Sequence, residues 1–151
     1  MAYWRMQLHP DFGARSVEYA ASCITRGIIG LDFNSDIGDL RGTPCTIPDG
    51  QKGYRLFESE MEVGDHVLVQ SHHYPLALVE IASDYAYIPN SKEAFGIWCR
   101  HIRMVRNTSF YADYVTNPLN WERIPMTDTI SPLRDSDGKA FQLIDTWLRR
   151  I

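Results

Sequence analysis

The chain has 151 residues, of which 44% are hydrophobic and 23% are charged, a balance typical of one globular domain. Its formal net charge of −4 disfavours a protein that binds nucleic acid strongly without specificity, because phosphate contacts need a basic surface. No window is apolar enough to cross a bilayer, and the first ten residues lack the apolar core of a signal peptide. We therefore expect a cytoplasmic protein without membrane contacts.

Residues 3–8 predict a first strand, because two aromatic residues are followed by alternating positions. A helix is predicted to begin at Ser16 and to end at Gly27. Residues 28–33 are apolar enough for a buried strand. The stretch 34–50 is rich in Gly, Pro, Asp and Thr, and predicts a loop whose length indicates either function or disorder.

A short helix is predicted over 54–61, and the clearest signal in the chain follows it. The Gly64-Asp65 turn launches an apolar run that ends at Gln70 and predicts a strand. A second apolar run over 75–82 predicts the strand that follows it along the chain.

Residues 84–96 predict a polar loop, and 97–106 predicts a further strand. Another strand is predicted over 110–115, whereas 119–137 is expected to be irregular. A final amphipathic helix is predicted over 139–150. Many short strands with few helices predict a single α+β domain, a small and mostly antiparallel β-barrel flanked by helices.

The three cysteines, Cys23, Cys45 and Cys99, are widely spaced and form no CxxC pair, so neither a zinc ribbon nor a disulfide framework is expected. The adjacent His72 and His73 would point to opposite faces of a strand and cannot easily share one ion. We therefore expect no metal and no cofactor.

Three segments carry a family resemblance. Residues 61–70, Met-Glu-Val-Gly-Asp-His-Val-Leu-Val-Gln, resemble the M-x-x-G-D-x-V strand pair of PUA-like barrels. The opening Ala2-Tyr3-Trp4 resembles the start of EVE domains. Residues 29–40 resemble the G-x-G-aromatic … G-D-L stretch of EVE-like domains in modification-dependent restriction systems. The resemblance covers roughly residues 1–106, but the EVE run Trp-Asp-Gly-Val-Arg-Asn is replaced here by Gly-Leu-Asp-Phe-Asn-Ser.

The resemblance implies that the chain, like EVE and YTH domains, holds a flipped, modified base in an aromatic-lined pocket. The expected pocket residues are Asp32, Phe33, Asn34, Ser71, His72, Tyr85, Tyr87 and Trp4. The expected phosphate contacts are Arg5, Arg41, His73, Arg100 and Arg103.

The chemistry of a base pocket fits several of these residue types. Phe33 with Tyr85 or Tyr87 could stack on a base, and one such contact contributes about 1–3 kcal/mol. That gain offsets the few kcal/mol needed to flip the base. Asp32 could accept a hydrogen bond from an exocyclic amine. The alternative is that Phe33 and Trp4 are core residues and that Asp32 only caps a turn.

Three functions remain open at this point. The first is a reader of modified DNA, the specificity domain of a restriction or defence system, with any nuclease or NTPase on another domain or chain. The chain would then be a whole protein or the N-terminal part of a larger one. No G-x-S-x-G, P-loop or H-E-x-x-H motif occurs, so we expect no catalysis in this chain.

The second function is an ASCH-like small hydrolase or ribonuclease, which requires a Lys, Tyr or His near an acidic residue. The third is a protein-interaction barrel without a ligand, for which Phe33, Tyr85 and Tyr87 should all be buried in the core.

Overall fold

The computed structural model describes residues 1–8, 15–33, 35–41, 47–48, 50–117, 119, 121–125 and 128–151. The strands are β1 (Tyr3–Gln7), β2 (Ile28–Leu31), β3 (His66–Ser71), β4 (Tyr74–Ile81), β5 (Ala86–Tyr87), β6 (His101–Phe110) and β7 (Ile130–Pro132). The helices are α1 (Ser16–Ile24), α2 (Gly53–Arg55), the π-helix η1 (Leu56–Glu60), α3 (Ser91–Phe95), α4 (Tyr111–Tyr114) and α5 (Lys139–Arg150).

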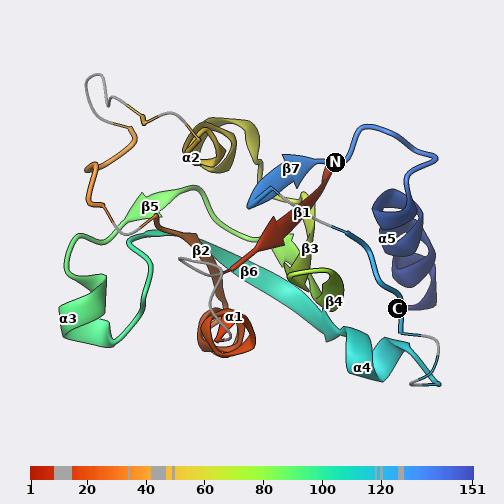
Figure 1. Ribbon diagram of the computed structural model, residues 1–151. Helices are drawn as coiled ribbons and strands as arrows, with labels where there is room; N and C mark the ends of the chain where they lie inside the picture. The colour runs from red at the N-terminus through yellow and green to blue at the C-terminus, as the bar shows by residue number, and fades with distance from the viewer. Residues whose placement is uncertain are drawn as a thin grey trace.

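The described strands form one seven-stranded sheet in the order β2-β6-β4-β3-β1-β7, with β5 paired to β6. β1 and β3 are parallel, with Tyr3 opposite His66, and the other pairs are antiparallel. The sheet curls into a half-barrel with helices around it (Figure 1). The predicted α+β class and the barrel-like sheet flanked by helices are therefore confirmed.

The two edge strands of the curled sheet meet at the start of α2. A Cβ atom on Gly53 would lie 2.6 Å from Cγ2 of Ile130 in β7 and 3.9 Å from Cδ2 of Leu31 in β2. Only glycine fits the close approach of the helix to the Ile130 side chain, whereas the distance to Leu31 is an ordinary van der Waals contact. The short helical segment α2–η1 thus spans the opening between the edges.

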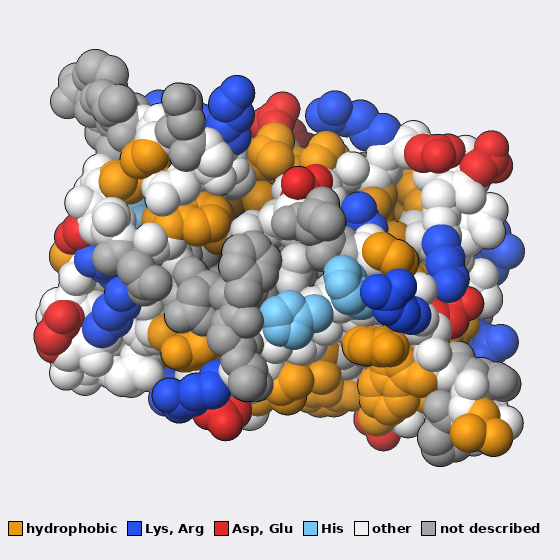
Figure 2. Space-filling view, viewed as in Figure 1, with side chains coloured by type: hydrophobic (Ala, Val, Ile, Leu, Met, Phe, Trp, Pro, Cys, Tyr) orange, Lys and Arg blue, Asp and Glu red, His pale blue; other side chains and the backbone are white. Residues whose placement is uncertain are grey.

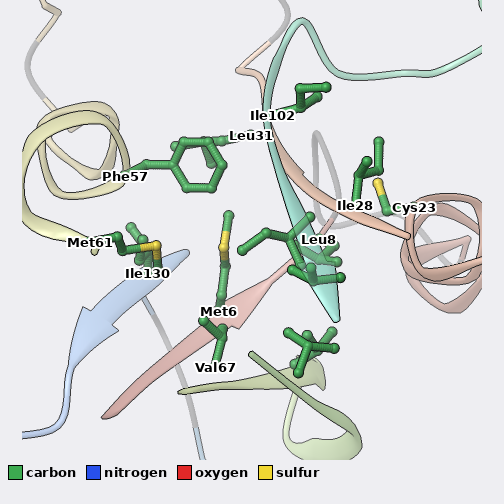
Figure 3. Packing of buried hydrophobic residues seen from close by; sticks show 14 of the residues in the cluster. Met6, Leu8, Cys23, Ile28, Leu31, Phe57, Met61, Val67, Ile102 and Ile130 are labelled. Carbon is green, nitrogen blue, oxygen red and sulfur yellow. The ribbon is translucent and has the colours of Figure 1, made fainter. Parts of the chain in front are cut away.

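β3, near the middle of the sheet, is buried on both faces. Val67 and Val69 of β3 belong to the cluster inside the curl, whereas Leu68 packs outward with Ile144 and Trp147 of α5. This alternation follows from the two-residue period of a strand. Figure 3 shows the inner cluster, where side chains from the sheet meet those of α1 and η1. Each fully buried side chain of this size contributes roughly 1.5–3 kcal/mol.

Several element boundaries differ from the sequence prediction. The strand expected over 97–106 is β6, which begins at His101 and continues to Phe110, and the strand expected over 110–115 is instead the short helix α4. The segments expected to be loop or irregular contain β5, α3 and β7. Apolar periodicity does not distinguish a buried loop from a strand. Strands of two or three residues form only because a neighbouring strand pairs with them, so they leave no pattern in the sequence.

In the part of the chain that the structure describes, no helix is both long and apolar enough to cross a bilayer.

Candidate functional site

Five rings from distant parts of the chain gather where β2 ends and β6 begins. The strand register places Leu31 and Tyr87 on either side of His101, so the end of β2 and the short β5 flank the first residue of β6. We call the five rings the aromatic cluster; its members are Phe33, Tyr54, Tyr85, Tyr87 and His101. The His101 ring centroid lies 4.8 Å from Tyr54, 5.2 Å from Tyr87 and 5.8 Å from Tyr85.

His101 is the buried centre of the aromatic cluster, with 1% of its surface exposed. Its Nδ1 lies 2.6 Å from the Tyr85 hydroxyl, which accepts a second hydrogen bond from the Leu40 amide. The Tyr85 hydroxyl, with one proton and two lone pairs, can donate to Nδ1 or accept from it. Nε2 has no hydrogen-bond partner among the described residues.

The aromatic cluster holds its titratable groups in their neutral forms. Burial is the largest cause that lowers the pKa of His101 to about 4. Burial also raises the pKa of Tyr54 to about 12, and that of Tyr85 well above its ordinary value. At neutral pH the cluster is thus an uncharged aromatic surface with polar atoms at fixed positions.

Phe33 and Tyr87 are the half-buried members of the cluster. The Phe33 ring packs edge-on against Tyr54 at 5.0 Å, and the Tyr54 hydroxyl accepts a hydrogen bond from the Phe33 amide. The Tyr87 hydroxyl donates to Asp36 Oδ1 at 2.6 Å, and burial together with this bond raises the pKa of Tyr87 to about 12. Both rings are held by contacts yet retain exposed surface.

An ion-pair network borders the cluster. Asp32, whose side chain is fully buried, accepts hydrogen bonds of 2.7 and 2.9 Å from the Arg100 guanidinium and of 3.1 Å from the Arg100 amide. This pairing raises the pKa of Arg100. Arg100 also lies 3.6 Å from Asp36, and Lys92 Nζ lies 3.9 Å from Asp32.

A second pair lies on the other side of Tyr85. Arg41 binds Asp39 through two guanidinium nitrogens at 2.9 and 3.1 Å, and its guanidinium carbon lies 5.3 Å from the centre of the Tyr85 ring. Arg41 is exposed, so it is a cation of the surface beside the cluster.

The structure therefore brings together six of the residues that the sequence predicted. They are Asp32, Phe33, Tyr85, Tyr87, Arg41 and Arg100. Tyr85, at 4% exposure, supports the ring system from within, whereas Phe33 and Tyr87 reach the surface. Asn34 lies outside the described residues.

The turn between β3 and β4 lies elsewhere. β4 and β6 pair with Ile81 opposite Val105 and Ala77 opposite Phe110, so this turn lies toward the far end of β6 from His101. Ser71 instead bonds the Ser16 hydroxyl at 2.8 Å, and His72 adopts a left-handed φ of 56° in the turn. The predicted grouping of Ser71, His72 and His73 with the cluster is thus not what the fold produces.

Trp4 and Arg103 are core residues. Trp4 is 3% exposed and packs in the inner cluster, so it is not placed to form a wall of a base pocket. Arg103 is 2% exposed, and its guanidinium donates to four carbonyl oxygens, those of Phe57, Glu58, Met61 and Ser83, at 2.8–3.1 Å. A buried guanidinium whose donors are used in this way does not fit the predicted phosphate contact. Arg103 instead connects η1 to the sheet through these hydrogen bonds.

Arg5 also lies away from the aromatic cluster, at the edge of the sheet where β1 pairs with β7. Its guanidinium donates to Ser131 Oγ at 3.1 Å and to the Pro125 carbonyl at 3.2 Å. On the face drawn in Figure 2, Lys and Arg side chains lie among Asp and Glu rather than in one continuous basic strip.

Sequence reasoning did not assign a role to three residues of this site. Tyr54 reaches the cluster from α2, Asp36 from the segment after β2, and His101 from β6. The only feature of the sequence that drew attention to His101 was its position between Arg100 and Arg103, in a stretch rich in basic residues. The described residues contain no group of three or more His, Cys, Asp or Glu side chains arranged to hold a metal ion.

Comparison of the chain with protein-family models, with curated proteins and with solved structures found no match in any of the three.

Proposed function

We propose that the chain is a PUA-like, EVE-like binding module that takes up one modified, flipped DNA base at the aromatic cluster. It would act as the specificity domain of a restriction or defence system, with cleavage or NTP hydrolysis on another domain or chain. The observation that carries this proposal is the pair of half-exposed rings, Phe33 and Tyr87, beside a buried His101 with an unpartnered Nε2.

The rings supply the main binding energy in this proposal. A base that stacks on Phe33 or Tyr87 gains about 1–3 kcal/mol per contact. The Tyr87–Asp36 hydrogen bond and the edge-on contact of the Phe33 ring with Tyr54 already fix both side chains, so little side-chain entropy is lost when a base binds.

A polar edge supplies the discrimination. A buried polar atom without a partner costs roughly 1–3 kcal/mol, and a ligand group that reached Nε2 of His101 after a shift of the side chains that cover it would recover that cost. Asp36 offers a carboxylate at the border of the cluster for an exocyclic amine. A base carries both acceptors and amines along one edge, which suits this pair of groups.

The charges around the cluster favour recognition of one base over binding of a long backbone. The carboxylates of Asp32, Asp36 and Asp39 are balanced by Lys92, Arg100 and Arg41. With few unbalanced cations, fewer than about three phosphates should be neutralised, which gives a salt slope shallower than about −3.

Binding of short labelled DNA duplexes tests the proposal. The duplexes carry 5-methylcytosine, 5-hydroxymethylcytosine, N6-methyladenine or no modification, and binding is measured at two salt concentrations. We expect preference for one modified duplex, reduced roughly 5- to 150-fold by Phe33→Ala and by Tyr87→Ala.

Matched controls remove aromatic rings elsewhere. Phe95 in α3 and Tyr74 in β4 are 59% and 48% exposed, so Phe95→Ala and Tyr74→Ala should leave binding unchanged. Equal, weak binding of all four duplexes would remove the proposal. So would equal losses in the control variants.

A hydrolase is the second candidate, favoured by one observation. Lys92 Nζ lies 3.9 Å from Asp32, next to Arg100, in a site that also contains Tyr87 and His101. This is the combination that an ASCH-like hydrolase or ribonuclease requires, a Lys, Tyr or His beside an acidic residue.

Incubation with short ribonucleotide fragments separates the two candidates. Turnover that Lys92→Ala abolishes, and that an exposed control such as Lys52→Ala retains, would favour the hydrolase. If the fragments stay intact after prolonged incubation with the wild-type protein, the hydrolase is excluded and the binding module is the remaining candidate.

A further inference from the structure

A hollow lies at the β7 edge of the sheet, where β1 and β7 meet the first turn of α5. Its volume is about 540 Å³, within the range of roughly 300–1,000 Å³ that small-ligand pockets occupy. Its lining includes Arg5, Pro132, Leu133, Arg134, Lys139 and Phe141.

The lining is positively charged although the chain as a whole carries −4. It contains three cations, Arg5, Arg134 and Lys139, against the single carboxylate of Asp135. The excess of two positive charges matches a phosphate monoester, which carries about −1.5 to −2 at neutral pH, better than a single carboxylate.

Two of the cations are held in place. Ser131 Oγ and the Pro125 carbonyl accept hydrogen bonds from the Arg5 guanidinium, and the Arg123 carbonyl accepts one from Lys139 Nζ at 3.1 Å. Arg134 is exposed. A ligand would therefore meet two positioned cations, and Arg134 would supply the third.

The rest of the lining is apolar. Leu133, Pro132 and Phe141 line the hollow, and the Phe141 ring is fixed against the Tyr3 ring at a centroid distance of 4.7 Å. A bare inorganic anion would leave this surface unused. An aromatic or apolar body attached to the anion would cover it.

We propose that this hollow binds a phosphate monoester carried on an aromatic or apolar body. The inference is independent of base binding at the aromatic cluster, because the two sites share no residue. The ester has two possible sources with the same chemistry, a free small molecule and the terminal phosphate of a nucleic-acid strand.

Titration of ¹⁵N-labelled protein with phenyl phosphate tests the site. We expect saturable shifts of the Gly138, Ala140 and Phe141 amides. Inorganic phosphate lacks the apolar body and benzenesulfonate carries one charge, so both should bind more weakly. Arg134→Gln should weaken phenyl phosphate roughly tenfold, the loss expected for a hydrogen bond to a charged group.

Arg149→Gln is the matched control, because it removes an exposed arginine from the last turn of α5, which does not line the hollow. It should leave the affinity unchanged. Absence of saturation, shifts confined to other elements, or equal losses in Arg134→Gln and Arg149→Gln would overturn the proposal.

A competition experiment then identifies the source. A 5′-phosphorylated dinucleotide that displaces phenyl phosphate, where its 5′-hydroxyl counterpart does not, indicates a strand end. Failure of both to displace it indicates a free small ester. Phe33→Ala should change none of these results, so failure of base binding and failure of this site remain distinguishable.

Discussion

The indole Nε1 of Trp4 donates a hydrogen bond of 3.0 Å to Oδ2 of Asp65 inside the fold. The same carboxylate accepts hydrogen bonds from the amides of Ala2 and Glu62 at 2.9 and 3.0 Å. The aromatic opening of the chain and the Gly-Asp turn before β3 thus meet at one buried group. This contact joins the start of β1 to the turn before β3, and the two strands pair in parallel with Tyr3 opposite His66.

Asp65→Ala should lower the free energy of unfolding by about 3 kcal/mol or more, because three donors lose a charged acceptor. Trp4→Phe keeps the ring and should cost about 1–2 kcal/mol, since two of the three bonds remain. Asp113 is exposed on α4, so Asp113→Ala is the control and should be nearly neutral. Chemical denaturation measures all three, and similar values for the two aspartate variants would contradict the assignment.

Arg103→Lys should destabilise the fold by at least about 3 kcal/mol, because an ammonium cannot satisfy four carbonyls arranged for a guanidinium. Arg106→Lys, three residues along β6, removes an exposed guanidinium that pairs with Glu80 and should cost less than about 1 kcal/mol. Thermal and denaturant unfolding measure the losses of stability in the two variants and show whether the first is the larger. A tolerated lysine at position 103 would show that the guanidinium does not hold η1.

The stability of the fold should fall as the pH drops from about 6.5 to about 4. The pKa of His101 is lowered to about 4 in the folded state from 6.5, so in this interval the unfolded chain binds a proton that the folded chain refuses. The contribution is about 3 kcal/mol, complete above the unfolded value and lost as the pH falls through the interval.

His101→Gln removes the titrating group and should flatten this pH dependence. Asp36, Asp39 and Glu80, whose pKa values are lowered mainly by hydrogen bonds, contribute to the acid loss in both proteins, so the difference between the two curves reports mainly on His101. Denaturant titrations at about pH 7 and about pH 4.5 give that difference. If stability falls equally with pH in the wild type and in His101→Gln, the imidazole of His101 is not buried in its neutral form.

Gly30→Ala should be severely destabilising, since a Cβ atom at this position would lie 2.0 Å from the Cys99 Sγ atom. We expect a loss of about 3 kcal/mol or more from overpacking. Cys99→Ala removes the clashing sulfur, although the Cys99 Cβ would still lie 3.0 Å away. The double variant should therefore be more stable than the sum of the two single effects predicts.

A double-mutant cycle measured by chemical denaturation tests this coupling. Gly27→Ala is a useful comparison, because it has open space at Cβ but a positive φ of 71°, so its cost comes from the backbone and not from a clash. Cys99→Ala should not rescue it. Strict additivity at Gly30 would contradict the close packing of β2 against the segment before β6.

Local patterns determined much of the fold. The Gly64-Asp65 turn and the apolar run behind it predicted β3, and the spacing of apolar residues predicted α1 and α5. These elements are confirmed because their own period sets which face is buried. Asp32 and Phe33, at the end of a predicted strand, and Tyr87, in the predicted loop over 84–96, were also named as candidate site residues, on the strength of the family resemblance.

Other features were decided only by tertiary structure. β7 is three residues long, includes Pro132 and exists because β1 offers it an edge, a position that proline tolerates. Tyr54 and His101 meet through the curl of the sheet, and the burial of Arg103 depends on carbonyls of η1. The turn at His72 lies far from the aromatic cluster, because the register of β4 on β6 places this turn near the end of β6 that is opposite His101. Such contacts join residues distant in sequence, and no local pattern encodes which strands will pair or how far the sheet will curl.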